Sequence, residues 1–179
     1  MRSWGVKLLI LVAELMAACG QGYALDVWFA PEENCQAVIV AEIDKAEKTI
    51  DYQLYNATSQ PIGDALIRAE KRGVEVRMLL DARANANNGH SIAASCKAAG
   101  CDVRFDAKHP ISHNKVRIID GKIVLSGSFN DSRQANRNAE NLTREDEPQA
   151  VKEFADNFET HWKHGVKSVP PSKPRARRR

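Results

Sequence analysis

The sequence predicts one α/β domain built on a mixed, partly parallel β-sheet. Segments with strand alternation and segments with helical periodicity take turns along the first two thirds of the chain. Two further strand-like segments then meet at Asp120-Gly121, which is a strong hairpin signal. With 179 residues, 43% of them hydrophobic and 27% charged, the chain suits a single domain with a sizeable core.

The alternating part of the chain divides at proline, glycine and polar residues. Pro61 opens one helical segment and Gly73 closes it, as helix ends prefer, and Gly100 closes the next. In order, the expected elements are a helix at 33–48, a strand at 49–55, a helix at 61–73, a strand at 74–81, a polar loop at 82–90, a helix at 91–99 and a strand at 101–105.

The remaining third of the chain predicts a hairpin of strands at 113–120 and 122–128, a last strand at 138–144 and a helix at 148–164. Val151, Phe154, Phe158 and Trp162 recur at spacings of three and four, so they form one apolar face that packs on the core. Residues 166–179 show no apolar periodicity and are expected to form a disordered basic tail.

Residues 1–24 resemble a secretory signal peptide that is cleaved after Ala24. Basic residues precede an apolar run at 6–18, which is shorter than the roughly 20 residues of a membrane-spanning helix and is interrupted by Glu14. An alternative is lipoprotein processing at Cys19, although Met16 makes that match poor. We therefore expect a secreted or periplasmic protein with a domain at 25–165.

Charge and cysteine usage add three expectations. The net charge is +3, yet five basic residues fall in the last seven positions, so the folded body is slightly acidic and attraction to polyanions resides in the tail. In an oxidising compartment Cys96 and Cys101 are close enough in sequence for a disulfide, which leaves Cys35 as a free or buried thiol. No CxxC pair or Cys/His cluster with ligand spacing is evident, so neither a metal site nor a cofactor is expected.

Four polar residues of the predicted hairpin converge at one edge of the sheet. His113 and Lys115 lie on one face of a strand because successive side chains alternate, and the returning strand brings Ser128 and Asn130 to the same end. This set suits a bound phosphate: Lys115 supplies charge, and Ser128 and Asn130 donate hydrogen bonds. His113 is the one nucleophile or proton carrier among the four.

The segment HNKVRIIDGKIVLSGSFN fits H-x-K-x(4)-D-x(6)-G-S-x-N and resembles the HKD motif of the phospholipase D superfamily. The stretches KRGVEVRMLLD, SIAASCKAAGCDVRFD and NAENL resemble small secreted bacterial endonucleases of that superfamily, over most of residues 25–165. The resemblance implies a mixed β-sheet flanked by helices on both faces, with one HKD motif per chain.

The resemblance also implies a metal-independent phosphodiesterase that works through a phosphohistidine at His113. Lys115, Ser128 and Asn130 would hold the phosphate, and Glu140 would orient the nucleophilic histidine. Asp120 sits at the turn, so its role is expected to be structural. One departure is Asp131, which stands where the small nucleases usually have an aromatic residue, and the segment from there to Glu140 is one residue shorter.

The mechanism needs two facing histidines, but the chain contains one motif and no internal repeat. Of the other histidines only His161 has a lysine two residues on, and no Gly-Ser segment follows it. We therefore expect a homodimer with the active site on its two-fold axis. The small size and the arginine-rich tail favour a non-specific endonuclease for DNA, and also RNA. The alternatives are a phospholipase D that acts on phosphatidyl head groups and a catalytically silent nucleic-acid-binding protein.

Overall fold

The computed structural model describes residues 25–169. Among them the strands form one seven-stranded sheet in the order β1-β7-β6-β5-β2-β3-β4. The strands are β1 (Leu25–Ala30), β2 (Thr49–Leu54), β3 (Glu75–Asp81), β4 (Asp102–Asp106), β5 (Lys115–Ile119), β6 (Ile123–Gly127) and β7 (Glu140–Glu145). Strands β2, β3 and β4 run parallel, while the other neighbours pair antiparallel. The predicted signal peptide, its cleavage point and Cys19 lie outside the described residues, as do positions 170–179.

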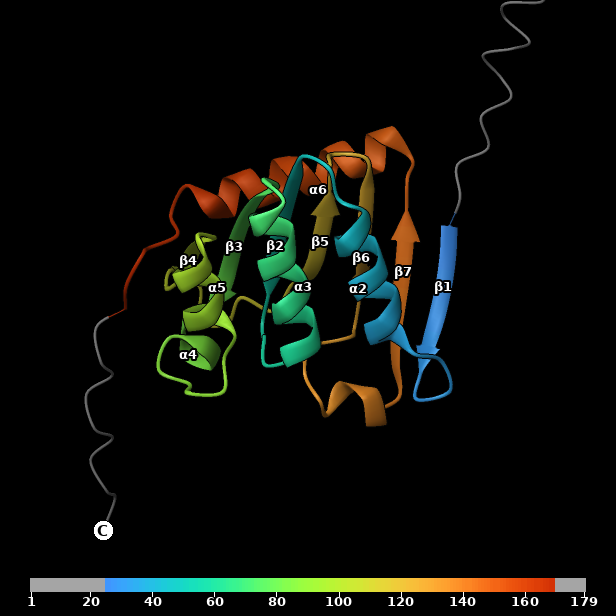
Figure 1. The fold of residues 1–179 in the computed structure, drawn as a ribbon, viewed down its shortest axis with the longest axis horizontal. Helices are drawn as coiled ribbons and strands as arrows, with labels where there is room; N and C mark the ends of the chain where they lie inside the picture. Colours follow the sequence, from blue (N-terminus) through green and yellow to red (C-terminus); the bar gives the residue numbers. More distant parts are fainter. Residues whose placement is uncertain (1–24, 170–179) are drawn as a thin grey trace, which may run out of the picture.

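Helices cover both faces of this sheet (Figure 1). They are α2 (Cys35–Lys45), α3 (Gln60–Lys71), α4 (Ala82–Asn85), α5 (Ala93–Ala99), α6 (Pro148–Trp162) and the short 3-10 helix η1 (Ala135–Arg137). Helix α6 lies alone on one face, opposite α2, α3 and α5 (Figure 1). The predicted α/β fold with helices on both faces of a mixed sheet is thereby confirmed.

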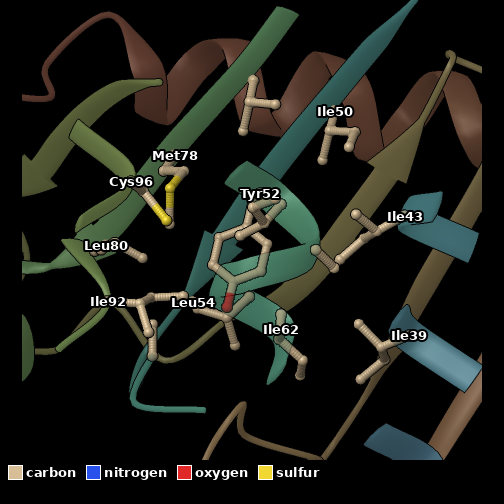
Figure 2. Packing of buried hydrophobic residues seen from close by; sticks show 14 of the residues in the cluster. Ile39, Ile43, Ile50, Tyr52, Leu54, Ile62, Met78, Leu80, Ile92 and Cys96 are labelled. Carbon is tan, nitrogen blue, oxygen red and sulfur yellow. The ribbon is translucent and has the colours of Figure 1, made fainter. Parts of the chain in front are cut away.

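The alternation of the strands divides the core into two parts. On one face, Ile39 and Ile43 of α2 and Ile62 of α3 pack around Tyr52 and Leu54 of β2 (Figure 2). On the other face, the predicted apolar stripe of α6 meets alternate residues of β3, β5 and β6. That second cluster contains Leu79, Val116, Ile118, Val124, Val151, Phe158 and Trp162. Among the described residues, no helix is long and apolar enough to cross a bilayer.

Asp120 fastens the β5–β6 turn to the start of β2. Its φ of 54° is unusual for a residue with a side chain, and its carboxylate accepts the backbone N–H groups of Glu47, Lys48 and Thr49 at 2.7–3.3 Å. Burial alone would raise the pKa of Asp120, but these hydrogen bonds lower it below its ordinary value. The contacts of Asp120 are therefore structural, at the end of the strands away from His113.

Three elements were not predicted, namely β1, η1 and α4. Strand β1 lies at the edge of the sheet, with Leu25, Val27 and Phe29 exposed. Helix α4 lies inside the predicted loop at 82–90. It forms because the Asp81 side chain caps it by accepting from Ala84 N at 2.8 Å.

The three cysteines within residues 25–169 are free thiols, and all three are buried. The disulfide between Cys96 and Cys101 is therefore wrong for this structure, whereas Cys35 is the buried thiol that was expected. A hydrogen bond with Cys101, together with burial, raises the pKa of Cys96. The thiolate needed for disulfide exchange is disfavoured accordingly.

The end of the domain extends past its predicted boundary. Val166 pairs with Phe105 through two backbone hydrogen bonds of 2.8 and 3.0 Å, and Lys167 forms an ion pair with Asp102 at 2.9 Å. Residues 166 and 167 therefore belong to the folded body and not to the tail, because β4 has a free edge that the chain can pair with.

Candidate active site

The predicted site residues gather where the parallel strands end. Lys115, the first residue of β5, pairs with Leu54, the last of β2. The hairpin register of Val116 with Ser126 carries the chain after Gly127 back to the same edge, where Glu140 opens β7. In open α/β sheets the crevice beyond the carboxyl ends of the strands is the usual ligand site.

His113 is exposed at this edge, and Lys115 is buried beside it. The Lys115 ammonium donates to the backbone oxygen of His113 at 2.7 Å and lies 5.2 Å from the centre of the Tyr55 ring. The ring of His113 packs against the same tyrosine, with centroids 4.8 Å apart. Burial lowers the pKa of Lys115 to about 8, and the negative charge of Glu140 opposes that shift in part. A buried cation next to an exposed imidazole suits a phosphate group.

Ser128 and Glu140 bond to each other. The Ser128 hydroxyl donates to Glu140 Oε2 at 2.5 Å and accepts from Asn141 N at 3.0 Å, while Asn138 Nδ2 donates to Glu140 Oε1 at 3.1 Å. Within residues 25–169 no hydrogen bond joins Glu140 to His113. In this subunit Ser128 and Asn138 bind the Glu140 carboxylate, so the orienting role expected for Glu140 stays a prediction. The Ser128 proton is likewise committed to Glu140 and not free for a phosphate.

Asn130 keeps an uncommitted side chain. Its Oδ1 is a buried acceptor without a hydrogen-bond partner among the described residues, and no described residue accepts a hydrogen bond from its Nδ2, so the Nδ2 donor is available to a phosphate oxygen. The preceding Gly127 is required by geometry, since its φ is +141° and an added Cβ would overlap the backbone carbonyl of Asn141. The Gly-Ser-x-Asn turn can therefore pass close to β7 and present Asn130 at the edge.

Asp131, the departure noted in the sequence, forms a buried ion pair with Arg117 of β5. Both side chains have no exposed surface. The Arg117 guanidinium also donates to Phe129 O at 3.1 Å, and Tyr52 OH donates to Asp131 Oδ2 at 2.5 Å. Asn130 therefore stands between two residues that Arg117 holds in place.

The backbone of Asp131 continues this support toward the helix side. Its carbonyl accepts from Thr58 N at 2.7 Å and Ser59 N at 2.8 Å, just before α3. The acidic residue thus replaces aromatic packing with a polar anchor, and the local path of the chain is set by hydrogen bonds.

A second polar cluster lies at the end of β4, which β2 and β3 separate from β5, and it was not anticipated. Asp106, His109, His161 and His164 place one ligand atom each within 4.8 Å of one another. Burial alone would raise the pKa of Asp106, but hydrogen bonds from His109 lower it well below its usual range. The signal in the sequence was weak: an Asp and a His three residues apart, and two His three residues apart, separated by some fifty positions.

Comparison with known proteins places this geometry in a family. Residues 39–162 match the family model described as cardiolipin synthase, PLD-like domain. The phospholipase D of Rickettsia prowazekii is 40% identical over 131 residues, which cover 73% of this chain and 63% of that protein. The mitochondrial cardiolipin hydrolase of Homo sapiens is 33% identical over 131 residues, covering 73% of this chain and 52% of that protein. This chain therefore spans less than two thirds of the length of either relative.

Two solved structures match over nearly their whole length. Nuc from Salmonella typhimurium, a phospholipase D family member, superposes with a TM-score of 0.76 at 32% identity, covering 80% of this chain and 97% of that one. NucT from Helicobacter pylori gives a TM-score of 0.76 at 25% identity and covers 81% and 99%. Together with the matched domain and the edge that carries His113, Lys115 and Asn130, these similarities show that the chain belongs to the phospholipase D superfamily.

Proposed function

We propose that this protein is a phosphodiesterase in which His113 attacks phosphorus and forms a phosphohistidine. The observation that carries this proposal is the exposed His113 imidazole beside the buried Lys115 ammonium, with the free amide of Asn130 at the same edge. Lys115 neutralises charge on the phosphate oxygens, and Asn130 donates a hydrogen bond to them. His113 is the nucleophile.

The reaction proceeds in two balanced steps. A ring nitrogen of His113 forms a bond to phosphorus, the bond to the leaving oxygen breaks, and that oxygen takes a proton from a second, protonated histidine. The second histidine, now neutral, accepts a proton from water as the water oxygen bonds to phosphorus, and the bond between phosphorus and the His113 nitrogen breaks and returns its electron pair to that nitrogen. The products are an alcohol and a phosphomonoester, and both histidines return to their starting protonation states.

The second histidine is His113 of another subunit, in a two-fold dimer. Within residues 25–169 no other histidine ring is recorded against that of His113, whose ring neighbour is Tyr55. His109 and His161 instead face Asp106. A two-fold axis at this edge supplies the missing acid with one interface, because each His113 then faces its copy.

Nucleic acid is the substrate class that we favour. A cavity of about 220 Å³ borders the backbone groups that bond Asp131, and apart from Pro61 its lining residues carry polar side chains, among them the exposed Arg133. Such a lining suits a second phosphate of the same strand better than an acyl chain. The basic residues at the C-terminal end of the sequence add a second electrostatic attraction to a polyanion.

A phospholipid is the second candidate, and one observation favours it. A cavity of about 290 Å³ beside Asn114 is lined in part by Val116, Ala150 and Phe154. An apolar lining next to the residue that follows His113 could seat part of an acyl chain. The names of the curated relatives point in the same direction.

The test compares plasmid DNA with phosphatidylcholine vesicles as substrates of the chain from Leu25 onward, with EDTA present. The temperature is chosen so that the protein stays folded in EDTA. We expect DNA nicking that survives EDTA, because Lys115 and His113 perform the charge neutralisation that a metal ion performs in other nucleases. His113→Ala should abolish nicking, whereas the exposed His90→Ala should not. Release of choline without nicking would reverse the substrate assignment, and loss of neither activity in His113→Ala would overturn the mechanism.

A further inference from the structure

The Asp106 cluster has the composition and shape of a metal site. Asp106 Oδ2 lies 2.8 Å from His109 Nδ1, 3.5 Å from His161 Nδ1 and 3.4 Å from His164 Nε2. One carboxylate oxygen therefore faces three imidazole nitrogens, and a single hydrogen bond to this oxygen would need one of them. All four ligand atoms fall within 4.8 Å of one another.

Two of these nitrogens form no hydrogen bond with the described residues. His161 Nδ1 and His164 Nε2 are buried atoms without a hydrogen-bond partner among the described residues, which is costly unless a ligand satisfies them. Zn²⁺ bonds to imidazole nitrogen and carboxylate oxygen at about 2.0–2.1 Å, so the ligands of a tetrahedral site stand about 3.3 Å apart. The distances of 3.5 and 3.4 Å from Asp106 Oδ2 to His161 Nδ1 and His164 Nε2 match this ligand–ligand distance. The distance from Asp106 Oδ2 to His109 Nδ1 has to increase by about half an ångström.

The cluster is held by contacts that do not depend on an ion. Asp106 Oδ1 accepts the backbone N–H groups of Lys108 and His109 at 3.0 and 3.2 Å, which leaves Oδ2 to face the histidines. The paired backbones of Phe105 and Val166 fix the chain directly beside Asp106 and His164. Secondary contacts of this kind orient metal ligands before the ion arrives.

We propose that Asp106, His109, His161 and His164 form a structural Zn²⁺ site that joins the end of β4 to the end of α6. Three nitrogen ligands and one carboxylate favour Zn²⁺ over Mg²⁺ or Ca²⁺, which prefer oxygen. Four protein ligands complete a tetrahedron and leave no open position, so the site serves stability. A cavity of about 490 Å³ that borders Asp106 and His109 gives the ion a path from solvent.

The position of the site gives the ion a role in the fold. His109 lies four residues before His113, in the loop that connects β4 to β5. The other end of that loop is held where Ser112 N donates to Asp81 Oδ2 at 2.8 Å. Zn²⁺ would therefore fix the first half of the β4–β5 loop to α6. The second half of this loop leads to His113, the proposed nucleophile.

The experiment uses the chain from Leu25 onward, purified without a polyhistidine tag and stripped with a chelator. Titration with Zn²⁺, followed by calorimetry and elemental analysis, should give one ion per chain, and Co²⁺ should give the intense visible absorption of a tetrahedral site. At a free Zn²⁺ concentration about 100 times Kd, the Tm should rise by about 5–10 °C. His161→Asn and His164→Asn should each weaken Zn²⁺ binding by about a hundredfold or more.

The matched control is His90→Asn, which changes an exposed histidine outside the cluster and should bind Zn²⁺ as the wild type does. Wild-type protein that takes up no Zn²⁺ at micromolar concentration, or that gives the weak spectrum of octahedral Co²⁺, overturns the proposal. This outcome does not depend on whether the cluster variants fold. Since His113→Ala should bind Zn²⁺ normally, failure of the phosphodiesterase assignment and failure of the metal site are told apart.

Discussion

The buried pair of Arg117 and Asp131 gives the sharpest stability prediction. Asp131→Asn keeps the side-chain shape but removes the counter-charge of a guanidinium that has no exposed surface. Leaving one partner of such a pair buried alone costs about 3–5 kcal/mol, which is a large part of the 5–15 kcal/mol stability of an ordinary domain. For a chain of this length, that loss corresponds to a fall in Tm of about 6–20 °C.

Urea unfolding followed by tryptophan fluorescence measures this loss as a shift in midpoint at constant m-value. Arg117→Met in the Asp131→Asn background should cost less than the sum of the two single changes, because the unpaired charge is then gone. Lys152→Ala, which removes an exposed ion pair with Asp156, serves as the control and should leave the midpoint unchanged. A loss below about 1 kcal/mol for Asp131→Asn, or strict additivity of the two changes, would refute the reasoning.

Three further predictions concern the site and the turn. Because Lys115 binds phosphate as a cation and burial lowers its pKa to about 8, kcat/KM should fall more steeply as the pH rises above that value, and Lys115→Arg should lessen this fall in a pH–rate profile. If two copies of His113 share one site, mixing wild-type and His113→Ala subunits should reduce turnover as the square of the wild-type fraction, whereas a linear decrease or a monomer by light scattering would exclude the shared site. Asp120→Ala should lower the free energy of unfolding by about 2 kcal/mol in urea titrations at neutral pH, and since the pKa of Asp120 is lowered on folding, the difference from wild type should shrink as the pH falls through the acidic range.

The active-site edge was predictable because its signals are local. His113 and Lys115 are two residues apart, and the Asp120-Gly121 turn fixes which residues of the returning strand lie beside them. The role of Asp131 was not predictable, since its partners Arg117 and Tyr52 come from other strands and no spacing rule links them. The same reason hid the contact of Glu140 with Ser128, which depends on how β6 and β7 meet.

The Asp106 cluster and β1 were missed for two different reasons. The two halves of the cluster meet through contacts between segments about sixty residues apart, such as the pairing of Val166 with Phe105 and the hydrogen bond from Arg104 to Trp162 O. Strand β1 places Leu25, Val27 and Phe29 at alternate positions, but these side chains face solvent at the edge of the sheet, so the strand contributes little to the core. Its pairing with β7 depends on a distant segment that no local pattern identifies.

The pairing of β1 with β7 has a consequence for folding. Leu25–Ala30 is the first described strand to leave the ribosome, yet its one partner in the sheet, Glu140–Glu145, is made more than a hundred residues later. Contacts between such distant segments form late, because the entropy of closing a long loop is lost before the contacts stabilise the chain. Until then β1 presents an unpaired backbone edge and exposed apolar side chains to any other chain nearby. The sheet is therefore completed at its N-terminal edge last, although that edge is the first part of the domain to be synthesised.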